Sequence, residues 1–164
     1  MKRLFLVVGL TLAAYSWLSS QESNFNGHVL KTNPILTSLG WINGQYENIL
    51  NEKSSFLIMG DIIATDLFDE FGGVGLGVGY RRYFTYKKKP VPAGFYIQPQ
   101  IRTLFATDGD DQGFGGVIGF ELGYQWMWSS GFVLDLGLGP GFYFGEEFDG
   151  GTAPTGTLSI GYAW

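Results

Sequence analysis

The sequence contains no cysteine. This excludes a disulfide framework, a thiol nucleophile and a lipid-modified N-terminal cysteine. It also contains a single histidine, His28, with no acidic residue near it in the sequence. A lipid-modifying site that pairs histidine with serine or aspartate therefore has little to build on, and we interpret His28 as a polar surface residue.

The chain also lacks a run of the ~20 apolar residues that a transmembrane helix requires. Its longest apolar stretch, residues 4–18, follows Lys2 and Arg3 and ends in two serines. This order predicts a secretory signal peptide over residues 1–20, with a membrane anchor as the alternative. Residues 21–26 then form a short polar lead. If the rest of the chain enters a membrane, it does so as strands.

Glycine and aromatic residues are abundant, with 26 glycines and 17% aromatics among 164 residues. Between Val117 and Phe144, two runs alternate strictly between apolar side chains and small or polar ones, on either side of a turn at residues 129–131. Each run has about eleven residues, the length of a tilted membrane-spanning strand. A soluble barrel with its apolar face inward gives the same alternation, so this hairpin alone leaves both alternatives open.

The same period of two predicts eight strands. They are His28–Leu36, Trp41–Leu50, Ser55–Thr65, Val74–Phe84, Phe95–Phe105, 117–128, 132–144 and Thr155–Trp164. Mostly tight connections (51–53, 85–94 and 129–131) gather at one edge. A brief connection near 37–40 and the longer loops 66–73, 107–116 and 145–154 gather at the other. Short periplasmic turns with longer external loops are typical of bacterial outer-membrane barrels.

We therefore predict an all-β fold, a closed eight-stranded antiparallel up-and-down transmembrane β-barrel over residues 27–164, preceded by a signal peptide. Both termini are expected on the periplasmic side of a Gram-negative outer membrane. Aromatic residues are expected to form two girdles. These are Tyr83, Phe84, Phe95, Trp126, Trp128, Phe132 and Trp164 near the turn edge, and Phe105, Phe142, Phe144 and Phe148 near the loops.

The last strand alternates up to a terminal aromatic residue through Leu158, Ile160, Tyr162 and Trp164. This pattern looks like the C-terminal signal by which the outer-membrane assembly machinery recognises its substrates.

Five further stretches carry a resemblance to known proteins. They are Lys31-Thr32-Asn33-Pro34, Tyr46-Glu47-Asn48, Tyr80-Arg81-Arg82-Tyr83-Phe84, Ala93-Gly94-Phe95-Tyr96 and Gly131–Gly141. In sequence they resemble an uncharacterised family of short outer-membrane barrels from Bacteroidota. In architecture the chain is similar to small barrels of the OmpX and OmpA transmembrane type. The resemblance covers most of the mature chain and implies an outer-membrane location, but that family brings no established catalytic residues.

Charged residues at the alternate strand positions that face the barrel interior, which we call the inward parity, are expected to pair in the lumen. They are Lys31, Glu47, Asp61, Arg81, Arg102, Glu121 and Asp135. An eight-stranded barrel is just wide enough for side chains to fill it, and unpaired ions in a dry lumen are costly. The pattern predicts an ion network that plugs the barrel, with a proton or ion path as the alternative.

A second set of acidic residues falls in the three long loops. It consists of Asp66, Asp69, Glu70, Asp108, Asp110, Asp111, Glu146, Glu147 and Asp149. Without Lys2 and Arg3, eight basic and fifteen acidic residues give a net charge of −7, which argues against binding to nucleic acid. We expect a solvated surface or divalent-cation bridging to outer-leaflet phosphates. Residues 108–111 resemble a calcium loop, but Gly119 occupies the position of the required glutamate. No metal or cofactor site is predicted.

The function we predict is non-enzymatic, a structural or accessory binding role in the cell envelope. One alternative is a subunit of a larger assembly or secretion complex, with Gly60, Pro99 and Pro140 as candidate contact positions on the outer face. A lipid-modifying enzyme and a narrow pore are the others. The expected partners are outer-membrane lipids, the assembly machinery during biogenesis and, in the first alternative, a larger envelope complex.

Overall fold

The computed structural model describes residues 27–64, 71–85, 87, 92–108, 111–145 and 150–164. The predicted signal peptide and polar lead lie outside this part of the chain. Its elements are β1 (His28–Thr32), α2 (Pro34–Ser38), β2 (Trp41–Asn51), β3 (Ser54–Ala64), β4 (Phe71–Tyr83), β5 (Gly94–Asp108), β6 (Asp111–Met127), β7 (Phe132–Gly145) and β8 (Gly151–Ala163). No helix in the described residues is long and apolar enough to cross a membrane.

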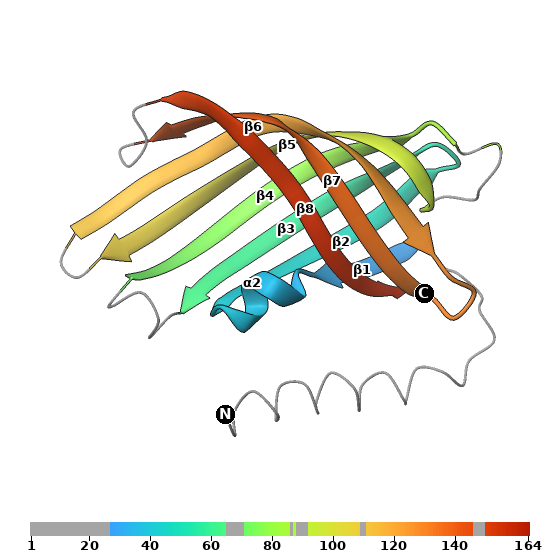
Figure 1. Ribbon diagram of the computed structural model, residues 1–164, viewed down its shortest axis with the longest axis horizontal. Coiled ribbons are helices and arrows are strands. Elements are labelled where there is room, and N and C mark those ends of the chain that lie inside the picture. The colour runs from blue at the N-terminus through green and yellow to red at the C-terminus, as the bar shows by residue number, and fades with distance from the viewer. Residues whose placement is uncertain (1–26, 65–70, 86, 88–91, 109–110, 146–149) are drawn as a thin grey trace, which may run out of the picture.

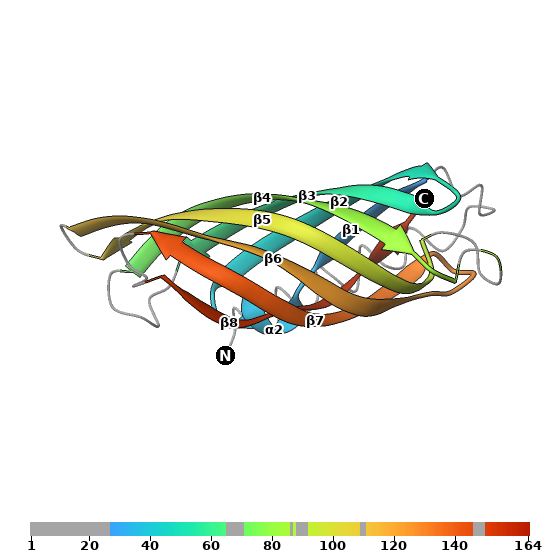
Figure 2. The same ribbon diagram turned by 90° about the horizontal axis from the view of Figure 1, so that it is seen from above.

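The eight strands form a closed antiparallel barrel in sequence order. β1 and β8 close it, with Leu30 opposite Tyr162. Mutual backbone hydrogen bonds between His28 and Trp164 extend this pairing, at N···O distances of 3.2 and 3.0 Å. Figure 1 shows β8 meeting β1 near the C-terminus, and Figure 2 shows the strands running obliquely along the long axis. The prediction of an all-β, closed eight-stranded barrel is confirmed.

Side chains alternate between the lumen and the outer surface, as the period of two predicts. On β3, Leu57 and Met59 are buried whereas Ile58 and Ile62 are half exposed. The interior is largely polar, because fifteen of the buried residues among those described are polar or charged and eleven are hydrophobic. Large apolar side chains instead cover the exterior.

The first strand is shorter than predicted. It ends at Thr32, and Asn33 caps α2 by accepting hydrogen bonds on its side-chain oxygen from the backbone N–H groups of Ile35 and Leu36, at 3.0 and 3.1 Å. Pro34 occupies the first turn of the helix, where its missing N–H group is tolerated. The prediction of a strand through Leu36 is wrong because the capping signal of Asn33 and Pro34 outweighs the alternation of apolar residues.

Strands at the loop edge are longer than predicted. β5 and β6 pair as far as Thr107 with Gln112 and Asp108 with Asp111, so the prediction of a loop over residues 107–116 is wrong. β8 likewise begins at Gly151 rather than at Thr155. Asp108 and Asp111 are therefore strand residues. The other seven acidic loop residues lie outside the described part of the chain: Asp66, Asp69, Glu70, Asp110, Glu146, Glu147 and Asp149.

The glycines that suggested a loop serve close packing instead. A Cβ atom on Gly116 would lie 2.6 Å from Cζ of Phe144, so the absence of a side chain lets this ring cover the strand. Glycine inside a strand often marks such a close approach.

Aromatic rings contact one another at two levels of the exterior. At the turn edge, Phe95, Tyr124 and Trp126 form a row with ring centroids 4.6 and 4.4 Å apart. At the loop edge, three phenylalanines on neighbouring strands form a second row. They are Phe105, Phe114 and Phe144, at 4.8 and 6.4 Å. Tyr83, which we predicted for the aromatic girdle near the turn edge, is instead buried in the lumen.

Candidate functional site

The turn-edge half of the lumen holds a cluster of four buried charges. Its members are Lys31 on β1, Glu47 on β2, Arg81 on β4 and Asp135 on β7, which we call the ion cluster. Lys31 Nζ lies 2.8 Å from Glu47 Oε2 and 2.7 Å from Asp135 Oδ2. Arg81 Nη2 lies 2.9 Å from Asp135 Oδ2, and its Nη1 lies 3.4 Å from Glu47 Oε2. Two cations and two carboxylates balance, and all four side chains are inaccessible to solvent.

Neutral polar groups complete the hydrogen bonding of the ion cluster. Tyr83 donates to Glu47 Oε1 and Tyr96 donates to Asp135 Oδ1, each at 2.7 Å. Gln125 Oε1 accepts from both Lys31 and Arg81, at 2.9 and 2.6 Å. Two further contacts involve Ser55, which donates to Glu47, and Gln98, which accepts from Arg81. This completeness matters because a buried ion pair is favourable only when its remaining donors and acceptors are satisfied.

Tyr96 contacts both an anion and a cation of the ion cluster: it donates a hydrogen bond to Asp135, and its ring packs against Arg81. The guanidinium carbon of Arg81 lies 3.7 Å from the centroid of the Tyr96 ring, a cation–π arrangement. Gly123 and Gly137 make room for this tyrosine, since a Cβ atom on either would lie 2.3 or 2.7 Å from the hydroxyl. Glycine on the inward face of β6 and β7 thus sets the position of the ring over Arg81.

Glu121 lies apart from the ion cluster. Its carboxylate accepts hydrogen bonds from Gln100 at 2.7 Å, from Thr157 at 2.7 Å and from Thr155 at 3.1 Å. None of the four ion pairs among the described residues includes it. A chain of amides still connects the two sites, because Gln98 donates to Gln100 at 2.8 Å.

Asp61 and Arg102 lie toward the loop edge and do not form an ion pair with each other. Asp61 accepts a hydrogen bond from the indole N–H of Trp41 at 3.1 Å. The Nε atom of Arg102 is buried without a hydrogen-bond partner among the described residues. The prediction of one paired network of seven residues is therefore wrong for Asp61, Arg102 and Glu121, which take part in none of the ion pairs among the described residues.

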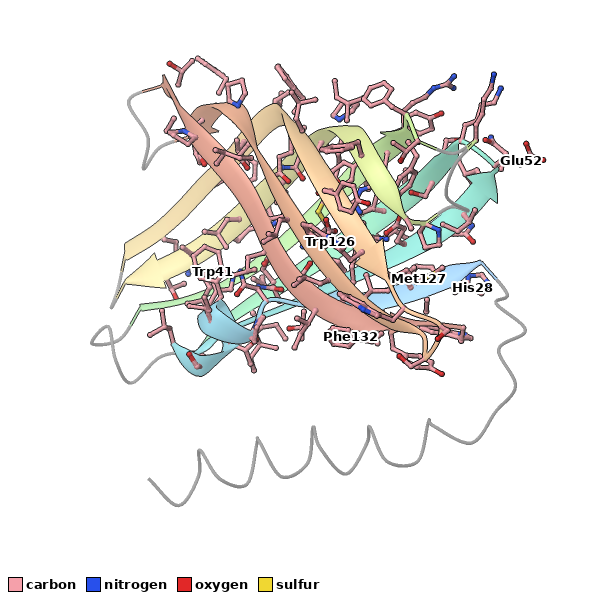
Figure 3. The ribbon with its side chains drawn as sticks, turned by 45° about the vertical axis from the view of Figure 1, so that its right-hand side comes forward. His28, Trp41, Glu52, Trp126, Met127 and Phe132 are labelled. Carbon is pink, nitrogen blue, oxygen red and sulfur yellow. The ribbon has the colours of Figure 1, made fainter. Side chains whose placement is uncertain are left out.

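The lumen is closed at the turn edge. Gln125 Nε2 donates to the carbonyl oxygen of Pro92 at 2.6 Å, which holds Pro92 beside the ion cluster. Beside it, Val29 and Val133 are buried and pack with Ala163 and Met127. Figure 3 places Met127 at this end and Trp41 at the opposite end. Toward the loop edge, by contrast, the side chains of Trp41 and Arg102 are only half-buried.

His28 lies at the turn edge (Figure 3), where two aromatic rings are its neighbours. Its Nδ1 atom is 2.7 Å from the hydroxyl of Tyr46, and its ring is stacked on that tyrosine with centroids 5.8 Å apart. Trp164 lies 6.0 Å from the same ring. Within the described residues, no group of three or more His, Asp or Glu residues is placed to hold a metal ion.

No family model, curated protein or solved structure matches the chain. The resemblance to small outer-membrane barrels thus stays a prediction, and the site must be interpreted from its own geometry. Sequence reasoning missed the roles of Ser55, Tyr96, Gln98, Gln100 and Gln125, although each has the inward parity of the charged residues. Of the residues of the predicted assembly signal, Ile160, Tyr162 and Trp164 lie on the stretch that pairs with β1, and Leu158 lies just beyond this pairing.

Proposed function

We propose that the protein is an integral outer-membrane barrel with a structural or accessory binding role and no catalytic chemistry of its own. The observation that carries this proposal is the inverted polarity of the barrel. Arg81, Glu47 and Asp135 are completely buried, whereas Leu76 and Ile118 are 70% and 53% exposed. A water-soluble barrel of this size would have the opposite arrangement, because apolar area is stabilised by removal from water.

The spacing of the two aromatic rows supports a bilayer. Phe95 and Phe105 are ten residues apart on β5. With a rise of ~3.4 Å per residue and a strand tilt of about 40°, this separation projects to about 26 Å along the barrel axis. The apolar band of an outer-membrane barrel has about this height and is bounded by aromatic girdles.

The filled lumen favours a scaffold over a pore. The ion cluster is neutral and fully hydrogen-bonded, and Gln125, which binds two of its members, also holds Pro92. An ion that crossed the barrel would have to separate Lys31 or Arg81 from its carboxylate partners inside a medium of low dielectric. Discrete conductance steps in planar bilayers would therefore contradict the proposal.

A charge placed on the outer face tests membrane insertion. Ile118 lies near the middle of β6, between Phe114 and Tyr124 of the two aromatic rows. Ile118→Arg should lower the unfolding free energy in phosphatidylcholine liposomes by about 2–4 kcal/mol. The matched control is Gln112→Arg, which lies on the same face but beyond the aromatic row at the loop edge. This substitution should cost about 0–1 kcal/mol. Urea titration followed by tryptophan fluorescence measures both.

The opposite result would identify a water-soluble barrel. There, arginine at an exposed position changes stability by about 0.5 kcal/mol or less in either direction, so equal values for the two variants would overturn the proposal. A second readout is electrophoretic mobility. The folded barrel should migrate differently before and after boiling in detergent, and a single mobility would contradict a membrane barrel.

A further inference from the structure

Where β1 meets β8, the two strands are paired over only part of the length of β8. β1 pairs with β8 from Val29 opposite Ala163 to Thr32 opposite Ile160, and there the chain enters α2. β8 continues for nine more residues, 151–159, toward the loop edge. Figure 1 shows β8 diverging from α2 in this direction, and α2 packs chiefly against β2. Within the described residues, no strand pairs with this edge of β8.

The register identifies the backbone groups that face the edge. In an antiparallel pair, opposed residues alternate between hydrogen-bonded and non-hydrogen-bonded pairs. Pro140 lies opposite Pro154, and neither has an N–H group, so this pair is non-hydrogen-bonded. Even-numbered residues of β8 therefore direct their backbone groups away from β7. The mutual bonds of Trp164 with His28 follow the same parity.

Four residues of β8 accordingly present backbone groups on this edge: Thr152, Pro154, Gly156 and Leu158. The hydroxyl of Tyr143 donates to the carbonyl oxygen of Pro154 at 3.2 Å. Continuation of β1 would place Pro34 opposite Leu158, where it has no N–H group to donate. Pro154 itself fits an edge strand, to which proline in sheets is largely confined. Both prolines thus favour an edge that the chain does not cover with its own β1.

The edge lies at the depth of the proposed apolar band. Through the β7–β8 register, Leu158, Gly156 and Thr152 lie beside Leu136, Leu138 and Phe142. These three neighbours are 41%, 66% and 51% exposed. Open sheet edges do not occur facing lipid within the hydrocarbon region, because an unsatisfied backbone group costs several kcal/mol there. This step rests on the proposed membrane location.

We propose that the edge of β8 from Thr152 to Leu158 binds an extended peptide segment of another membrane protein by strand addition. Along this edge Thr152, Gly156 and Leu158 each offer an N–H and a C=O group, whereas Pro154 offers only a carbonyl group, which accepts from Tyr143. The edge positions recur about 6.8 Å apart, and an added strand supplies acceptors and donors at the same spacing. A lipid phosphate accepts hydrogen bonds but cannot donate to the carbonyl groups. The bound strand runs antiparallel to β8, in line with β1.

The side chains of β8 set the character of the bound segment. On the outer face, Gly156 has no side chain, and on the inner face Thr155 and Thr157 are small and polar. The segment is therefore about seven residues long, with apolar residues toward the lipid and small or polar residues toward the lumen.

The test uses the purified full-length barrel in phosphatidylcholine nanodiscs and a synthetic heptapeptide of alternating valine and threonine with blocked ends and a photo-crosslinking residue. We expect cross-links on residues 151–158 of β8. A second peptide of the same sequence is N-methylated at the alternate residues that face β8, and its cross-linking should fall at least tenfold. Equal cross-linking of the two peptides would show insertion without strand addition and would overturn the proposal.

Two variants at one position give a matched control. Gly156→Pro removes the edge N–H group, and Gly156→Ala keeps it while adding the same Cβ atom, which lies 3.1 Å from the carbonyl oxygen of Gly137 in either case. We expect the alanine variant to cross-link like the parent and the proline variant to lose at least tenfold. Loss in both variants, or in neither, would contradict pairing through this N–H group.

Amide exchange without peptide separates the remaining outcomes. The N–H groups of Gly156 and Leu158 should exchange rapidly. Slow exchange would mean that another part of the chain covers the edge, and protection that disappears in a maltoside detergent would assign the edge to phospholipid. Either result overturns the proposal. Heat-shifted mobility of the same sample reports insertion, so a barrel that inserts but does not bind peptide contradicts strand addition alone.

Discussion

Removal of one carboxylate from the ion cluster should destabilise the barrel strongly. Asp135 accepts hydrogen bonds from Lys31 at 2.7 Å and from Tyr96 at 2.7 Å, and it forms an ion pair with Arg81 at 2.9 Å. In Asp135→Leu the cluster retains two cations and one carboxylate, and the Tyr96 hydroxyl loses its acceptor. No water-accessible surface is available to screen the excess charge, because these side chains are fully buried.

The expected loss is about 3–5 kcal/mol, the range measured when one partner of a buried ion pair is removed. The second substitution Lys31→Met removes the excess positive charge and leaves Arg81 paired with Glu47. The double variant should therefore be more stable than Asp135→Leu alone, with a coupling energy of about 2 kcal/mol or more. This recovery separates an electrostatic penalty from damage to packing.

The assay is urea unfolding in phosphatidylcholine liposomes, followed by tryptophan fluorescence. Ser159→Ala provides a local control, because Ser159 lies opposite Asp135 on β8 and its buried hydroxyl has no partner among the described residues. Its removal should change stability by less than about 1 kcal/mol. A loss of under 1 kcal/mol for Asp135→Leu, or a double variant no more stable than that single variant, would refute the interpretation.

Two further substitutions test parts of the lumen outside the ion pairs. Gly123→Ala places a Cβ atom 2.3 Å from the ring of Tyr96 and should cost about 1–3 kcal/mol in the same titration. Its control Gly60→Ala meets no atom within 4 Å and should be nearly neutral; similar losses would contradict a role for the glycine in placing the ring. Glu121→Gln should cost less than about 1 kcal/mol because no cation among the described residues pairs with this carboxylate, whereas Glu47→Gln should cost about 3 kcal/mol. Equal losses for the two glutamates would show that charge pairing does not distinguish them.

Much of the barrel could be predicted from the sequence because strand periodicity fixes which face each side chain occupies. The alternation on β3, for example, assigns Asp61 to the lumen and Ile62 to the exterior, and both lie there. A shift of one residue would reverse every assignment on a strand, so a strict pattern leaves little freedom. The four members of the ion cluster share this parity, and their pairing follows once the barrel closes.

Height within the lumen could not be predicted in the same way. The alternation along each strand predicts that Arg102 and Glu121 face inward. The register between β5 and β6, however, decides which residues lie side by side. Gln98 is the residue opposite Glu121 on β5, and Arg102 lies opposite Val117. The amide of Gln100 thus meets the Glu121 carboxylate while Arg102 lies higher in the barrel.

Local chemistry overrode periodicity at two places. At Asn33 and Pro34, a side-chain cap and a fixed backbone angle end β1, although Leu30, Thr32 and Leu36 continue an alternating pattern. At the loop edge, glycines near residue 115 suggested a turn, and the phenylalanine row formed over them instead.

The early end of β1 also explains the importance of Lys31. Four residues, Val29 to Thr32, form the described register between β1 and β8, whereas β7 and β8 pair over twelve positions from Phe132 to Tyr143. In the described register, β1 thus has only four paired positions with β8 and four with β2. Lys31 lies within it and reaches Glu47 on one side and Asp135 beyond β8 on the other. The ion cluster therefore links β2 and β7 across the closing strands, and it allows β1 to end early without opening the turn-edge half of the barrel. In the loop-edge half, by contrast, no strand among the described residues pairs with β8 beyond Ile160.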